Sequence, residues 1–160
     1  MFFIGVGILL CVAFLCWREY TAYLQRELDE LSDFLFFIEN MRDKMECYLQ
    51  SPLSWVGEFS RPSLERLGFL DSLRCDGDLG AAYRACSDKL LIKSDASEVI
   101  GELFSRFGEG YLDTERGLID STIHKLSIIE GKLKDELKNK SRAAGAMIGA
   151  IAIGAVIMII

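Results

Sequence analysis

Apolar residues recur at helical spacing in two long stretches of this chain, residues 18–50 and residues 113–142. Steps of three and four residues place side chains on one face of an α-helix. In the first stretch this face is formed by Leu24, Leu28, Leu31, Leu35, Ile38, Met45 and Leu49, widened by Phe34, Phe37 and Met41, with Arg42 at its one charged position. In the second stretch it is formed by Ile119, Ile123, Leu126, Leu133 and Leu137. We therefore predict two long antiparallel helices whose apolar faces meet.

The segment between these helices predicts shorter ones. The first is expected at residues 51–59, opened by Ser51-Pro52, and the second at 64–73, after the break at Arg61-Pro62. The third is expected at 79–89. The fourth is expected at 95–107, where Asp95 and Glu98 fit a capping box. No window alternates convincingly between apolar and polar residues with a period of two. The expected fold is therefore an all-α bundle of about six helices.

Charge is confined to the middle of the chain. All 42 Asp, Glu, Lys and Arg residues lie between Arg18 and Arg142, so residues 1–17 and 143–160 are uncharged. A helix of residues 143–160 would rise about 27 Å, against about 30 Å for the hydrocarbon core of a bilayer. We expect transmembrane spans at 1–17 and 143–160 and a helical domain at 18–142. A cleaved signal peptide is the alternative at residues 1–17, but the stretch has no basic residue and no small-x-small site before Trp17.

Basic residues next to the two apolar ends predict the orientation of the domain. Arg18 and Arg26 follow the first end, and five basic residues between Lys132 and Arg142 precede the second. Basic flanks stay on the cytoplasmic side and favour contact with lipid phosphates. We expect the helical domain in the cytosol, with membrane lipid as one partner.

Small residues form a ridge in the second apolar end: Gly145, Ala146, Gly149, Ala150 and Gly154. Such a ridge lets another helix approach closely. The expected partner is the first span, which has Gly5 and Gly7, although the ridge is also compatible with contacts between chains in a homo-oligomer.

Acidic residues are interspersed with the first apolar stripe. Glu27, Asp29, Glu30 and Asp33 are typical of a solvated helix face, and the alternative is that Glu27, Glu30 and Asp33 form an acidic docking face for a basic protein partner. The net charge of -6 argues against a nucleic-acid partner.

The sequence offers little chemistry for catalysis. His124 is the only histidine, the five cysteines form no CxxC pair, and no phosphate-binding loop or nucleophile motif is present. We expect no enzyme activity, no cofactor and no metal, with the cysteines serving as small packing residues.

One stretch resembles a known family. Residues 104–113 read FSRFGEGYLD and are similar to the paired-Gly motif followed by Asp in stage III sporulation protein AB, here Gly108, Gly110 and Asp113. The N-terminal span, the helix ending before Ser51-Pro52 and the Gly-rich end after Lys138 and Lys140 extend the resemblance over nearly the whole chain. Where that family usually has Gln shortly after the Asp, this chain has Glu115-Arg116-Gly117.

The resemblance implies a place in a membrane complex. Members of that family belong to a channel complex in the mother-cell membrane around the forespore, needed for late forespore development. Their helical domain is similar to that of type II secretion and type IV pilus platform proteins. The implied partners are a cytosolic hexameric secretion-type ATPase and other membrane proteins of the complex. A pilus or secretion platform protein is the alternative, although such proteins usually have two helical domains. The alternative from a different class is a membrane-bound enzyme or sensor, which would need a cluster of ionisable residues in one pocket.

Overall fold

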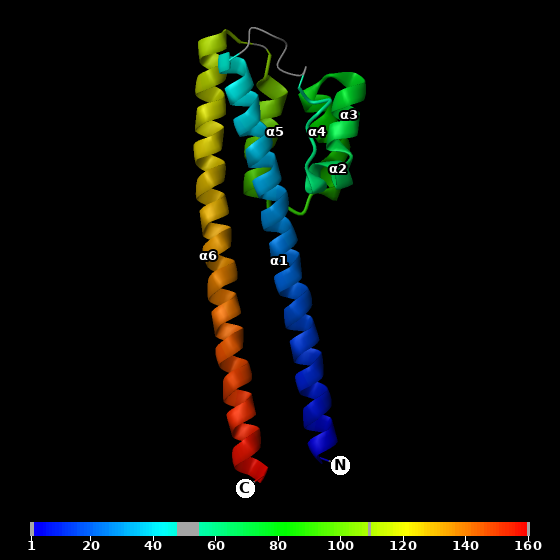
Figure 1. Cartoon of the computed structure of the whole chain (residues 1–160), viewed down its shortest axis with the longest axis vertical. Helices are drawn as coiled ribbons and strands as arrows, with labels where there is room; N and C mark the ends of the chain where they lie inside the picture. Colours follow the sequence, from blue (N-terminus) through cyan, green and yellow to red (C-terminus); the bar gives the residue numbers. More distant parts are fainter. Residues whose placement is uncertain (1, 48–54, 109, 160) are drawn as a thin grey trace. The chain divides into compact units, whose positions relative to one another are not determined.

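The described part of the chain consists mainly of α-helices (Figure 1). The computed structural model describes the backbone of residues 2–47, 55–108 and 110–159, and the side chains of 11–12, 14–45, 55–93, 95–108, 110–111 and 113–143. The helices are α1 (Phe2–Cys47), α2 (Pro62–Leu67), α3 (Phe69–Asp76), α4 (Leu79–Cys86), α5 (Ser94–Arg106) and α6 (Leu112–Ile159), with a short 3-10 helix, η1, at Ser87–Lys89. Within the described ranges no strand is present, which confirms the all-α class.

The helices belong to two compact units. The core unit comprises residues 27–131, and the terminal unit comprises residues 1–26 together with 132–160. The domain boundaries expected after residues 17 and 142 fall inside α1 and α6, which have no break there. Across the residues whose side chains are described, no helix combines the length and the apolar character needed to cross a membrane. The expected spans at 1–17 and 143–160 lie mostly outside those residues.

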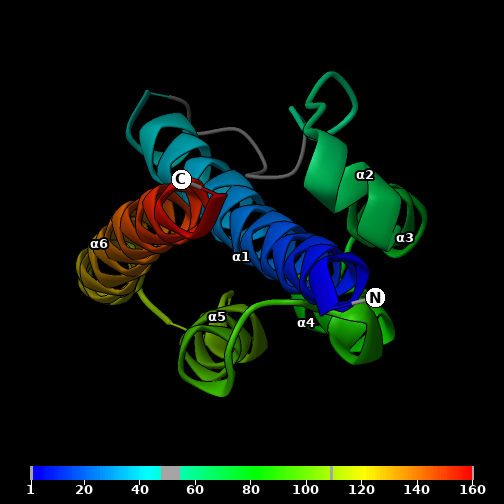
Figure 2. The same cartoon turned by 90° about the horizontal axis from the view of Figure 1, so that it is seen from below.

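In the core unit, residues 27–47 of α1 lie between α6 on one side and α2 and α3 on the other (Figure 2). The apolar stripe predicted for this part of α1 is buried: Leu28, Leu31, Leu35 and Ile38 are at most 8% exposed, and Phe34, Phe37 and Met41 are fully buried. From α6, Ile119 and Leu126 join the same core. The two stripes therefore meet in one core, as predicted.

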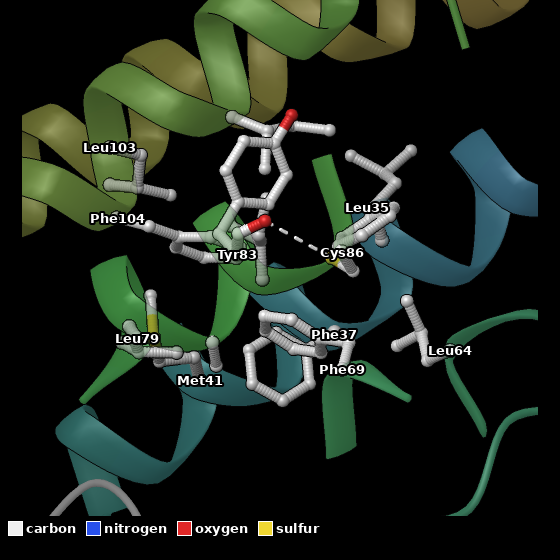
Figure 3. Close-up of a cluster of buried hydrophobic side chains, with 14 of the residues drawn as sticks. Leu35, Phe37, Met41, Leu64, Phe69, Leu79, Tyr83, Cys86, Leu103 and Phe104 are labelled. Carbon is white, nitrogen blue, oxygen red and sulfur yellow. Dashed lines mark hydrogen bonds between the residues drawn. The ribbon is translucent and has the colours of Figure 1, made fainter. Parts of the chain in front are cut away.

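Aromatic side chains fill the centre of this core (Figure 3). Phe69 of α3 stacks on Phe104 of α5 with ring centroids 5.6 Å apart, and Phe34 of α1 meets Phe69 edge to face at 5.5 Å. Tyr83 of α4 closes the cluster at 5.6 Å from Phe104. Burying each such ring contributes about 2 to 3 kcal/mol, so four helices are held together by one group of side chains.

The short helices differ in detail from the predicted ones. The expected helix at 64–73 is two helices, because Gly68 takes a left-handed backbone (φ 76°) that ends α2 and begins α3. In the expected helix at 51–59, residues 55–58 form a turn and residues 51–54 lie outside the described part. Arg61 precedes Pro62 and is extended (φ -145°, ψ 129°), the conformation that a following proline favours.

The start of α5 differs by one residue from the predicted one, whereas α4 begins at Leu79 as predicted. The structure places the start of α5 at Ser94, so Asp95 lies inside the first turn of the helix and the N-cap position falls on Lys93. At α4, the Asp78 side chain accepts a hydrogen bond from the Ala81 N–H at 3.1 Å and caps the helix. The predicted end of α5 near Gly108 is confirmed, since the helix stops at Arg106.

Candidate functional site

The three acidic residues proposed as a docking face are withdrawn from solvent. Glu27 is 3% exposed, Glu30 is fully buried, and the Asp33 side chain is 14% exposed. Neither the docking face nor a simple solvated face is correct for these residues. The reason is their spacing: Glu27 lies three residues after Leu24, and Glu30 lies four residues before Phe34, so both fall on buried rows of α1.

Glu30 joins three parts of the core unit. One carboxylate oxygen accepts hydrogen bonds from the backbone N–H groups of Leu91 at 2.8 Å and Ile92 at 3.3 Å. The other oxygen lies 3.6 Å from the guanidinium of Arg66 on α2. Burial raises the pKa of the Glu30 carboxyl above its ordinary value of 4.5, while the two backbone bonds and Arg66 act in the opposite direction. The carboxylate therefore serves to hold the segment before α5 against α1 and α2.

Asp33 starts a neighbouring helix. Its carboxylate accepts a hydrogen bond from the Ser63 N–H at 3.0 Å and lies 3.8 Å from the Arg61 guanidinium. The N-cap residue of α2, Arg61, makes no capping bond with its own side chain. Asp33 therefore satisfies, from another helix, one of the free N–H groups that every helix start leaves open.

The paired-Gly motif forms a turn closed by Glu115. The Glu115 carboxylate accepts hydrogen bonds from the backbone N–H of Gly108 at 2.9 Å and of Gly110 at 3.3 Å. Gly108 has a positive φ of 94°, which L side chains rarely adopt. Asp113 is exposed in the first turn of α6. The residue that organises this turn is thus Glu115, in the stretch Glu115-Arg116-Gly117 where the chain departs from the family. A Gln oxygen at this position could accept the same two bonds.

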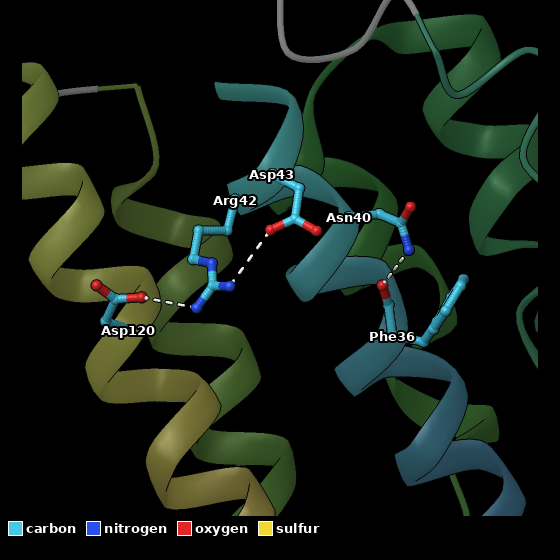
Figure 4. A network of polar contacts seen from close by, with 5 residues as sticks. All are labelled: Phe36, Asn40, Arg42, Asp43 and Asp120. Carbon is cyan, nitrogen blue, oxygen red and sulfur yellow. Dashed lines mark hydrogen bonds and ion pairs between the residues drawn. The ribbon is translucent and has the colours of Figure 1, made fainter. Parts of the chain in front are cut away.

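Arg42, the one charged residue in the first stripe, connects α1 to α6 inside the core unit (Figure 4). Its guanidinium lies 3.4 Å from the Asp120 carboxylate and 3.3 Å from that of Asp43. The hydrogen bonds to Asp43 and Asp120 raise the pKa of Arg42 further above its usual range. A cation at the edge of the apolar face is therefore accommodated because α6 brings a carboxylate to it.

The buried thiol and phenol of α4 are inert at neutral pH. Burial raises the pKa of Cys86 to about 11 and that of Tyr83 to about 12. The Tyr83 hydroxyl lies 2.8 Å from the Ser97 carbonyl and 2.9 Å from the Ser97 hydroxyl. A thiolate is the reactive form of cysteine, so a thiol held protonated is a packing group.

In the terminal unit, aromatic and basic side chains lie together. The Lys140 ammonium is 4.6 Å from the centre of the Tyr20 ring and donates hydrogen bonds to the Tyr20 hydroxyl and to Glu136. These two bonds, that to Glu136 first, raise the pKa of Lys140. Trp17 is half-buried, with its ring 6.3 Å from that of Phe14. Aromatic and basic residues of this kind are typical of lipid-water boundaries.

The remaining predicted site residues are the small residues of the second apolar end. Gly145, Ala146, Gly149, Ala150 and Gly154 belong to the α6 backbone, but the ridge they were expected to form lies outside the described side chains. His124 is exposed, and no group of three or more His, Cys, Asp or Glu side chains is placed to hold a metal among the described residues.

The chain matches no family model, no curated protein and no solved structure.

Proposed function

We propose that this chain is a membrane-anchored platform component of a sporulation channel complex. Its helical domain would face the mother-cell cytosol and meet a hexameric secretion-type ATPase. Its two ends would sit in the mother-cell membrane beside other proteins of the channel. The chain would not hydrolyse ATP; it would link the ATPase to the membrane components.

The observation that supports this proposal most is the continuity of α1 and α6. Each is a single helix, 46 and 48 residues long, whose uncharged end is joined to a charged part that contributes to the core unit. The uncharged ends, residues 1–17 and 143–160, are about as long as a helix needs to be to cross the hydrocarbon core of a bilayer. The basic residues beside them favour the cytosolic side for the domain.

The turn at Gly108 contains the glycines on which the family resemblance, and with it the sporulation role, rests. These paired glycines and Glu115 form one hydrogen-bonded unit between α5 and α6.

Deletion of the gene in its own host tests the proposal. We expect normal vegetative growth, with spore formation stopped after engulfment and restored by the full chain. A chain of residues 18–142, checked for equal abundance, should fail to restore it because both apolar ends are absent. Normal sporulation of the deletion strain would overturn the assignment and direct attention to secretion and pilus assays.

A further inference from the structure

The terminal unit contains a cleft between its two helices. It has a volume of about 530 Å³ and is lined by Trp17, Arg18, Thr21, Ala22 and Gln25 of α1 and by Leu137, Lys138 and Ser141 of α6. The α1 residues form two adjacent rows, 17–21–25 and 18–22, with steps of four, and the α6 residues 137 and 138 lie four and three residues before 141, so each set lies on one helix face. Sites for small ligands usually have volumes of about 300 to 1,000 Å³, so the cleft can hold a ligand group.

The charge of the cleft is entirely positive. Arg18 and Lys138 line it and no carboxylate does, in a chain whose net charge is -6. Lys140, two residues further along α6, does not line the cleft and is held by Glu136 and Tyr20. Residues two apart on a helix do not face each other, so the two lysines have separate roles. The cleft therefore selects an anion.

The rest of the lining is partly apolar. Trp17 and Leu137 form walls beside the two cations. The Thr21 hydroxyl already bonds to the carbonyl groups of Trp17 and Arg18, so recognition of an anion falls to Arg18 and Lys138. A guanidinium binds phosphate oxygens through two parallel hydrogen bonds, and an ammonium adds a point charge. The fitting ligand joins a phosphate to an apolar part.

We propose that this cleft binds the headgroup phosphate of an anionic phospholipid. Arg18 and Lys138 contact the phosphate, and Trp17 packs against the part of the lipid that enters the apolar layer. The inference rests on the membrane anchoring in the proposed function, because a lipid reaches the cleft only if the spans predicted at 1–17 and 143–160 lie in a bilayer.

Titration of the detergent-solubilised full chain with short-chain phosphatidylglycerol tests the site. The double variant Arg18→Gln with Lys138→Gln removes both cleft cations. The matched control, Arg26→Gln with Lys132→Gln, makes the same change of charge at exposed positions of the same unit outside the cleft. Each charge-assisted hydrogen bond to the phosphate contributes about a tenfold gain in affinity, so the cleft variant, which lacks both, should bind about a hundredfold more weakly. The control should stay within about threefold of the parent chain.

Three outcomes would overturn the site. Equal losses in the two double variants would show unspecific attraction, and unchanged binding in the cleft variant would show that the cleft is not used. Competition by glycerol phosphate or inorganic phosphate at the same concentration as the lipid would assign the cleft to a free phosphate. Far-UV circular dichroism of both variants checks that the helices are intact.

Insertion into phosphatidylcholine vesicles separates this inference from the proposed function. A chain that inserts but fails the titration loses only the lipid site. A chain that does not insert, when vesicles are floated through a density gradient, overturns the membrane anchoring and the lipid site together.

Discussion

The carboxylate of Glu30 on α1 accepts a hydrogen bond from the backbone N–H of Leu91, 61 residues later, at 2.8 Å. Substitution to Ala would remove the acceptor that the N–H groups of half-buried Leu91 and buried Ile92 share. We expect Glu30→Ala to lower the free energy of unfolding by about 3 kcal/mol, measured by urea denaturation of the full chain in detergent. The control Glu98→Ala, at an exposed position of α5, should change it by less than about 0.5 kcal/mol.

The same carboxyl predicts a pH dependence. Its pKa is higher in the folded chain than the ordinary value of 4.5, because burial disfavours the charged form. The folded state therefore binds the proton more tightly, and stability from this group is greatest below pH 4.5 and falls as pH rises through the folded pKa. Glu30→Gln has no such titration. The stability of the Gln variant relative to the parent chain should therefore rise over this window, and a constant difference would contradict the raised pKa.

Glu115 predicts a local effect at the paired-Gly turn. Glu115→Ala removes the acceptor for the N–H groups of Gly108 and Gly110, so these amides should exchange their hydrogens about tenfold faster. Glu115→Gln keeps an oxygen acceptor and should exchange at nearly the parent rate. Asp113→Asn, at an exposed neighbour, serves as the control. Equal exchange in the Ala and Gln variants would show that the side chain does not hold the turn.

Glycine substitutions test how closely α4 approaches α5. A Cβ on Gly80 would lie 3.2 Å from the backbone oxygen of Phe104, whereas one on Gly101 would lie 3.2 Å from the edge of the Tyr83 ring, which can shift. A Cβ on Gly117 would meet nothing within 4 Å. We expect Gly117→Ala to stabilise the chain by about 1 kcal/mol and Gly80→Ala to destabilise it by about 2 kcal/mol, with Gly101→Ala between them.

Urea midpoints of the three variants order these effects. If Gly80→Ala stabilised the chain, the backbone oxygen of Phe104 would have to lie further from position 80 than the 3.2 Å found for the added Cβ. A destabilising Gly117→Ala would mean that this part of α6 has a neighbour at that face.

Spacing predicted the core because burial follows the helical period. Leu31, Phe34, Ile38 and Met41 lie where the stripe placed them. The same spacing placed Glu30 on the row of Phe34 and Phe37, but its charge was taken to indicate solvent. A buried carboxylate is stable only with hydrogen-bond donors, and those donors come from residues 91 and 92, which no local pattern connects to α1. The burial of Glu30 therefore depends on long-range hydrogen bonds, which the pattern of polar residues along α1 does not reveal.

The Glu115 contact was missed for a similar reason. The family resemblance singled out Gly108, Gly110 and Asp113. A resemblance of sequence does not show which side chain accepts hydrogen bonds from the turn. The backbone amides of a turn need acceptors, and a carboxylate within one helical turn of the next helix start can supply them. Glu115 follows Gly108 by seven residues, across a turn, and this short separation in sequence is the signal that could have suggested the hydrogen bond.

The burial of Glu30 also shapes how the core unit opens. If residues 91 and 92 moved away while α1 stayed packed, the desolvated carboxylate would lose its two backbone N–H donors, which raises the free energy of the half-open state by about 3 kcal/mol. Such a half-open intermediate is thereby depopulated. The amide hydrogens of Leu91 and Ile92 should then exchange slowly, which makes them reporters of the opening of this segment.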